Sequence, residues 1–156
     1  MCEKILLNNF CLLKTLEQEN GIECLTEIED GYLAVCEKFK KILMYSPKEY
    51  TEIIITIKDQ EIINYNIYTK RKHLISATDE DIKVFNINLQ KRSYNLLQVL
   101  NYHKNLTLKL LELSNGKLAS STYDQTILIY DLKDNKYEKE LSINFWTRGI
   151  ECRDNK

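Results

Sequence analysis

The sequence predicts an all-β chain built from repeated four-stranded antiparallel units, and three observations support this fold class. The segment LTEIEDGYLAVC (residues 25–36) returns as LLELSNGKLASS (110–121), 85 residues later, with a weaker copy at 63–77. The segment GIEC (21–24) returns at 149–152, 128 residues later. Both offsets are multiples of about 42 to 43 residues, which is the period of four-stranded β-propeller blades.

Turn signals place the first hairpin of each unit. Asp30-Gly31 and Asn115-Gly116 are dipeptides that adopt positive φ at low cost and match the twist of paired strands. In the middle copy the turn falls at residues 69–72, which contain no glycine, so the hairpin there is predicted from its flanking strands.

A second tight turn and a third strand follow each hairpin. The third strands read ILMY, IKVF and ILIY, and two of them show no polar alternation, which indicates strands covered on both faces. Stacked blades bury both faces of a sheet in this way. The second turns are predicted at residues 37–41, 78–81 and 123–126, and the third strands at 42–45, 82–85 and 127–130.

A fourth segment completes each unit. In the last copy it is KYEKEL (136–141), whose alternating charges suit an exposed outer edge. The first copy has EIIITI (52–57) instead, and we expect that edge to be covered.

The predicted organisation is a single incomplete ring of three whole blades with partial blades at both ends. Residues 4–17 fit the last two strands of a preceding unit, and 148–152 fit the first strand of a following one. An amphipathic helix at residues 3–19 is the alternative at the N-terminus, because Leu6, Phe10, Leu13 and Leu16 fall at helical spacing. The predicted units are residues 1–20 (partial), 21–60, 61–104, 105–147 and 148–156 (partial).

Composition argues against several classes of function. The net charge of −1 is spread along the chain and provides no field for nucleic acid or an anionic membrane. Five cysteines without CxxC or Cys/His spacing indicate buried free thiols rather than a disulfide framework or a zinc site. No apolar run is long enough to cross a membrane and no export signal is evident, so we expect an intracellular, cytoplasmic protein. The basic cluster at 70–72 is expected to be a solvated turn, and His73 to cap a strand.

Residues 118–132 (LASSTYDQTILIYDL) resemble the core of a repeat of the WD-repeat β-propeller family. The resemblance implies a buried hydrogen-bonded set of a histidine, a serine or threonine, a turn aspartate and a terminal aromatic residue. The matching positions here are His103, Ser120 or Thr122, Asp124 and Tyr130, and Asp131 completes the aromatic-Asp pair. The other two units end in Tyr-Ser and Phe-Asn and lack the histidine, with Gln18 and Lys58 near its place.

A turn carboxylate beside an imidazole could also be a catalytic acid–base pair. The structural interpretation is favoured, because in a propeller the aspartate accepts amide bonds of its own turn while the histidine links strands. The sequence contains no GxSxG, HExxH or Gly-rich phosphate loop. We therefore expect no catalytic residues, no cofactor and no metal.

The leading functional hypothesis is a non-catalytic scaffold that binds other proteins. By the family resemblance, its binding face would include Phe39, Glu80, Tyr123, Gln125 and Trp146, at or near the entering and second-turn loops. The alternative is a structural subunit or fragment that completes a propeller with a partner or with a second copy of itself, since three blades are fewer than a closed ring needs. An enzyme is the third and least favoured hypothesis.

Overall fold

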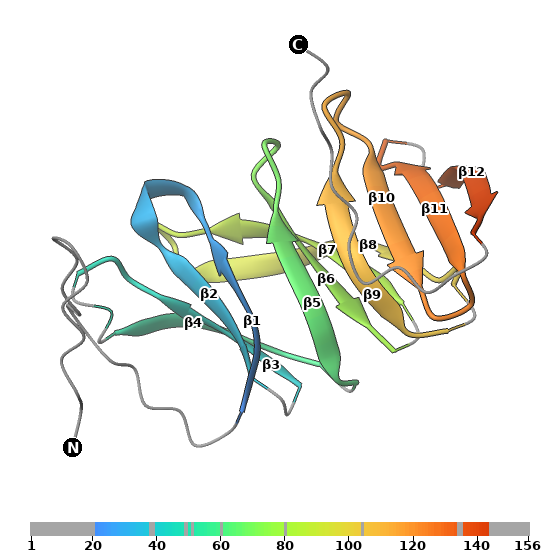
Figure 1. Ribbon diagram of the computed structural model, residues 1–156. Helices are drawn as coiled ribbons and strands as arrows, with labels where there is room; N and C mark the ends of the chain where they lie inside the picture. Colours follow the sequence, from blue (N-terminus) through green and yellow to red (C-terminus); the bar gives the residue numbers. More distant parts are fainter. Residues whose placement is uncertain are drawn as a thin grey trace, which may run out of the picture.

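A computed structural model of the chain describes residues 21–37, 40–48, 50, 52–59, 61–79, 81–103, 105–133 and 136–143. Its described residues form three four-stranded antiparallel sheets in simple meander order (Figure 1). We call them blades 1, 2 and 3. Blade 1 contains β1 (Ile22–Glu27), β2 (Leu33–Glu37), β3 (Lys41–Tyr45) and β4 (Ile53–Lys58). Blade 2 contains β5 (Ile63–Tyr68), β6 (His73–Thr78), β7 (Ile82–Asn88) and β8 (Ser93–Leu100). Blade 3 contains β9 (Thr107–Glu112), β10 (Leu118–Thr122), β11 (Thr126–Asp131) and β12 (Lys136–Ser142).

The predicted all-β class with three whole blades is confirmed. The only helical element in the described part of the chain is a 3₁₀ turn at Glu29–Gly31. The partial blades predicted for 1–20 and 148–156, and the alternative helix at 3–19, lie outside the described residues.

Positive backbone dihedral angles occur at the turns that the sequence marks. Asp30 and Gly31 have φ of 59° and 78°, and Gly116 has φ of 78°. In the second turns, Lys40 and Gln125 have φ of 65° without being glycine. The β5–β6 turn closes without glycine because Lys72 takes a φ of 64° and Thr69 accepts the Lys72 amide at 2.8 Å.

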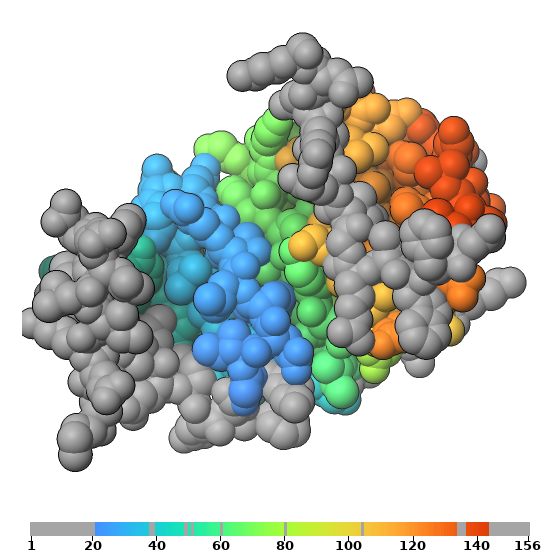
Figure 2. Space-filling model, viewed as in Figure 1, coloured from blue at the N-terminus to red at the C-terminus, as the bar shows by residue number. Residues whose placement is uncertain are grey.

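The blades stack face to face, and the first strands β1, β5 and β9 lie side by side (Figure 1). Figure 2 shows the surface of blade 1 in blue adjoining blade 2 in green, which in turn adjoins blade 3 in orange. One apolar cluster fills the space between blades 1 and 2, with Met44, Ile57 and Phe85 among its members. A second cluster fills the space between blades 2 and 3, around Leu100 and Tyr130. Ile42, Leu43, Met44 and Tyr45 of β3 are all buried, as expected for a strand covered on both faces. In β11, buried Leu128 and Tyr130 face blade 2, while Ile127 and Ile129 on the other side are half-buried.

Polar contacts also cross the blade boundaries. Asn66 on β5 donates its Nδ2 to Cys36 Sγ on β2 at 2.9 Å, and its backbone carbonyl accepts the Thr26 hydroxyl at 3.0 Å. Cys36 lies directly opposite Cys24 in the β1–β2 pairing, and both thiols are free. The two contacts of Asn66 therefore fix blade 1 against the innermost strand of blade 2.

The basic turn between β5 and β6 contacts both neighbouring blades. Lys72 Nζ lies 2.5 Å from Glu29 Oε2 in blade 1, and the Lys70 amide donates to Glu112 Oε2 in blade 3 at 2.8 Å. The Arg71 guanidinium lies against Gly116, where a Cβ atom would come within 3.4 Å of it. The side chains are exposed, as expected for a solvated turn, but this turn also links the three blades.

Candidate functional site

His103 and Ser120 form a buried polar pair between blades 2 and 3. His103 lies in the loop that leads from β8 to β9, and Ser120 lies in the centre of β10. Their Nε2 and Oγ atoms are 2.5 Å apart, and the two residues are 8% and 0% exposed. The Tyr130 ring packs edge-on against the imidazole, with centroids 6.1 Å apart. This contact joins the loop entering blade 3 to the two central strands of that blade.

Asp124 is bound within its own turn. Its carboxylate accepts the Thr126 amide at 3.1 Å and the Thr126 hydroxyl at 2.5 Å, and it also accepts the Thr122 hydroxyl. Among the described residues, His103 Nδ1 has no hydrogen-bond partner. The four residue types implied by the WD resemblance thus fall into two groups, His103–Ser120–Tyr130 and Thr122–Asp124–Thr126.

The environment of these groups shifts their pKa values in ways that follow from burial. Burial lowers the pKa of His103 to about 4, against a smaller opposing effect of the Asp124 carboxylate, so the imidazole is neutral near pH 7. Partial burial raises the pKa of Asp124, but the hydrogen bonds from Thr122 and Thr126 outweigh it and the pKa lies below its ordinary value. Burial raises the pKa of the Tyr130 hydroxyl. Near pH 7 the site therefore contains the neutral imidazole of His103 and the ionised carboxylate of Asp124.

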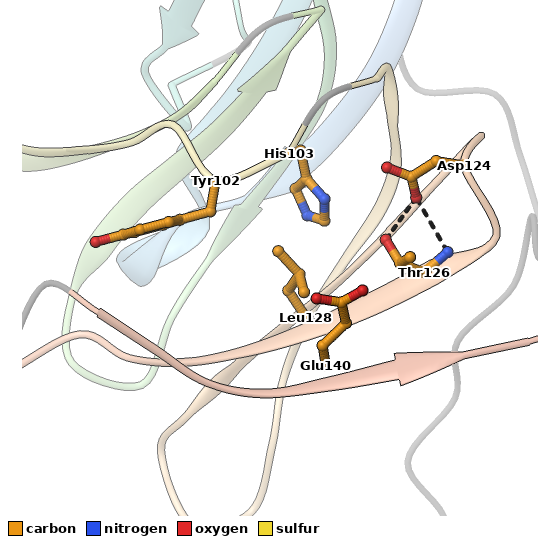
Figure 3. Close-up of a pocket in the computed structure, with 6 residues that line it drawn as sticks. All are labelled: Tyr102, His103, Asp124, Thr126, Leu128 and Glu140. Atoms are coloured by element: carbon orange, nitrogen blue, oxygen red, sulfur yellow. Dashed lines mark hydrogen bonds between the residues drawn. The ribbon is translucent and has the colours of Figure 1, made fainter.

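A pocket of about 260 Å³ lies beside His103 and Asp124 (Figure 3). His103 and Asp124 line it together with Tyr102, Thr126, Leu128 and Glu140, and the Asp124 carboxylate turns toward Thr126. Ser120 Oγ contacts Nε2 of the imidazole, and Thr122 and Thr126 donate to the carboxylate, so Nδ1 is the one of these polar atoms that lacks a partner among the described residues. This arrangement favours a structural role of the His–Asp pair over acid–base catalysis.

A second polar network lies between blades 1 and 2, and sequence reasoning missed it. Lys83 on β7 contacts both Asp59 carboxylate oxygens, at 2.7 and 2.9 Å, and lies 3.5 Å from Asp81. Nearby, the Thr78 hydroxyl donates to Glu61 at 2.6 Å. Partial burial lowers the pKa of Lys83, but the Asp59 and Asp81 carboxylates outweigh it and raise the pKa above its ordinary value. The charged residue in the otherwise apolar IKVF strand was the available signal.

The predicted binding face is described only in part. Tyr123 and Gln125 lie in the β10–β11 turn, where Tyr123 is half-buried and Gln125 is exposed. Backbone hydrogen bonds hold this turn, from Tyr123 to Leu106 at 3.1 Å and from Ile143 to Gln125 at 2.8 Å. Phe39, Glu80 and Trp146 lie outside the described residues. The second turns of all three blades lie at the same end of the molecule (Figure 1).

In the described part of the chain, no group of three or more His, Cys, Asp or Glu side chains is placed to hold a metal ion. None of its described helices has the length and apolar character needed to span a membrane.

The three stacked meanders have the arrangement of part of a β-propeller. No protein-family model matches the sequence, and no curated protein matches it significantly. Solved structures do match: the chain is similar to the WD40 β-propeller protein in "Structure of U3-55K", with a TM-score of 0.69 and 16% sequence identity. The match covers 81% of this chain and 41% of that one, so this chain spans less than half the length of the matched structure.

We expect Asp124→Ala to lower the free energy of unfolding by about 2 kcal/mol, because it leaves the buried Thr122 hydroxyl and the Thr126 amide without their acceptor. Thermal and urea unfolding measure the effect. Asp131→Ala, which removes one turn hydrogen bond to the Lys133 amide, is the milder control. An unchanged melt for Asp124→Ala would contradict the structural role of this carboxylate.

The folded protein should lose stability as the pH falls from about 6.5 to about 4. The His103 imidazole takes up a proton near pH 6.5 in the unfolded chain, but only near pH 4 in the folded protein. The unfolded state binds more protons in this window, so this contribution is complete above pH 6.5 and is lost toward pH 4. We expect a loss of at most about 3 kcal/mol in urea titrations at a series of pH values.

The control for this pH dependence is the second imidazole. Burial also lowers the pKa of His73, with Arg71 acting in the same direction. His103→Gln should reduce the pH dependence between 6.5 and 4, while His73→Gln should leave most of it in place. If His103→Gln keeps the full dependence, the effect belongs to other groups.

Proposed function

We propose that this chain is a non-catalytic protein-interaction module of the WD-repeat type. The observation that carries the proposal is its similarity to a WD40 propeller, combined with stacked blades whose second turns share one end. Rigid scaffolds that present loops at one end are suited to binding rather than to chemistry of their own. We also propose the division into the units predicted above and a cytoplasmic location, which cell fractionation would test.

The proposed binding face is the end that carries Tyr123 and Gln125. Tyrosine is enriched at protein interfaces because it combines apolar area with a polar group. By the family resemblance, Phe39, Glu80 and Trp146 belong to the same face.

The test compares the proteins that copurify with the tagged chain. Tyr123→Ala removes the aromatic ring, and Gln125→Gly removes the amide while accommodating the φ of 65°. Lys133→Ala, in the loop between β11 and β12, is the matched control at the opposite end. Loss of the same partners in both turn variants, with the control unchanged, supports this face; partners retained in all three variants would rule it out.

A second candidate function is completion of a propeller with a partner or a second copy. The side of blade 3 that faces away from blade 2 presents Leu111, Ile127 and Ile129, which are half-buried, and Leu141, which is 36% exposed. A face of this kind resembles the apolar surfaces that join the blades internally. Light scattering tests the idea, because a stable monomer of 18.5 kDa would contradict both self-closure and obligate completion.

A further inference from the structure

The outer strands of blades 1 and 2, β4 and β8, enclose a groove of about 330 Å³. Ile57 and Phe85 form its floor and are 1% and 4% exposed. Tyr94 and Leu96 form its wall and are 41% and 49% exposed. Tyr94 is positioned by Phe85, with ring centroids 6.0 Å apart in an edge-to-face contact. Lys58, Asp59 and Lys83 complete the lining, and Asp59 and Lys83 pair with each other, so the groove has an apolar side and a charged side. Its volume lies at the lower end of the range of about 300–1,000 Å³ for ligand pockets.

Side chains of this chain occupy part of the corresponding space between blades 2 and 3, beside the pocket at His103. Tyr102 contacts the rings of Tyr130 and Tyr137, with centroids 6.2 and 5.1 Å apart. Gln98 on β8 donates to the Leu132 carbonyl at 2.6 Å. Blades fan outward, so their outer strands leave a wedge that must be filled. At the boundary of blades 1 and 2, the described residues leave part of that wedge open.

Strand β8 exposes an uncharged, largely apolar surface. It has eight residues, none of them charged, and it also exposes Leu97 (44%) and Val99 (37%). Outer strands usually carry charges that prevent further pairing, as β12 does with Glu138, Lys139 and Glu140. An apolar outer strand beside an open groove is typical of a surface that a partner covers.

The charges around the groove indicate what its occupant carries. Lys58 lies at one end of the groove, is exposed, and has no ion-pair partner among the described residues. It pairs in register with Lys41, and like charges in such a pair are unfavourable unless an anion lies nearby. Lys41 forms an ion pair with Glu37, with Nζ and Oε2 4.0 Å apart. At the other end, Arg92 and Glu52 neutralise each other across the two blades, at 2.5 Å.

We propose that this groove binds an extended segment of a partner protein that carries an aromatic or aliphatic side chain with a carboxylate beside it. The apolar side chain packs between Ile57, Phe85 and Leu96, and the carboxylate pairs with Lys58. This surface is separate from the turn that carries Tyr123, so it adds a second contact to the proposed interaction module and names the chemistry of its partner.

The test measures fluorescence anisotropy of two labelled peptides with the full chain. Both peptides alternate phenylalanine and serine; one ends in two aspartates and the other in two lysines. We expect the acidic peptide to bind about tenfold more tightly than the basic one. Lys58→Glu should reverse this preference, and Leu96→Ser should weaken both peptides by about tenfold. Lys133→Glu in blade 3 should change neither, and Tyr123→Ala, which tests the other face, should leave the affinity unchanged.

The reversal by Lys58→Glu matters most, because a variant that merely unfolds would lose both peptides. Absence of binding, or an unchanged preference in Lys58→Glu, overturns the proposal. Sedimentation velocity tests whether a second copy of this chain occupies the groove instead. If the chain is a dimer that Leu96→Ser converts to monomers, the groove is an interface between copies and the proposal is wrong.

Discussion

Replacing Tyr130 with alanine should lower the free energy of unfolding by about 3–5 kcal/mol, the largest effect that we expect from a single side chain. Tyr130 is fully buried in the apolar cluster between blades 2 and 3 and touches the rings of His103 and Tyr102. Its loss opens a cavity at the point where three segments of the chain meet. Urea unfolding, followed by the far-UV circular dichroism of the backbone, measures the change.

Two control variants test which property of Tyr130 matters. One removes only its hydroxyl, and the other removes an exposed aromatic ring elsewhere. Tyr130→Phe keeps the packing and should cost less than about 1.5 kcal/mol. Tyr137→Ala removes a tyrosine that is 43% exposed and should also have a small effect. Equal losses for Tyr130→Ala and Tyr137→Ala would show that burial at position 130 does not determine the stability of this boundary.

Asp59→Ala should cost about 3 kcal/mol, because it removes the carboxylate closest to the mostly buried ammonium group of Lys83 and leaves Asp81 at 3.5 Å. The Lys83 and Asp59 side chains are 16% and 5% exposed, so water compensates little for the missing partner. Chemical unfolding at pH 7 measures the loss.

The double variant Asp59→Leu with Lys83→Met distinguishes an uncompensated charge from general damage to the boundary. Replacing a buried ion pair by apolar residues of similar size is often neutral, so the double variant should recover most of the stability. Glu52→Ala, which breaks the exposed ion pair with Arg92, should cost less than about 0.5 kcal/mol. A double variant less stable than Asp59→Ala would contradict the argument.

Local chemistry made the blade architecture predictable. Asp30-Gly31 and Asn115-Gly116 occupy turns with positive φ, and the apolar third strands contribute to the clusters between the blades. The contact between His103 and Ser120 lies at positions that the WD resemblance indicated, whereas the partners of Asp124 are the threonines on either side of it in the turn.

Contacts between blades were harder to predict, because they join residues far apart in the sequence. Asp59 and Lys83 are separated by 24 positions, and Asn66 and Cys36 by 30. A period of about 42 residues relates equivalent positions in different blades, but it does not say which non-equivalent side chains meet across a boundary. The exposed wall of the groove at Tyr94 and Leu96 was hidden for a different reason: an apolar strand has the same sequence pattern whether a neighbour covers it or not.

The β5–β6 turn has a consequence for the cooperativity of unfolding. In a linear array each unit contacts only its neighbours, so a terminal unit can open while the rest stays folded. Here one short hairpin of the middle blade contacts Glu29 on one side and Glu112 on the other, so opening this hairpin removes polar contacts to both flanking blades at once. The middle blade therefore couples the folding of the outer two through the apolar clusters on its two faces, and its β5–β6 turn takes part in both boundaries.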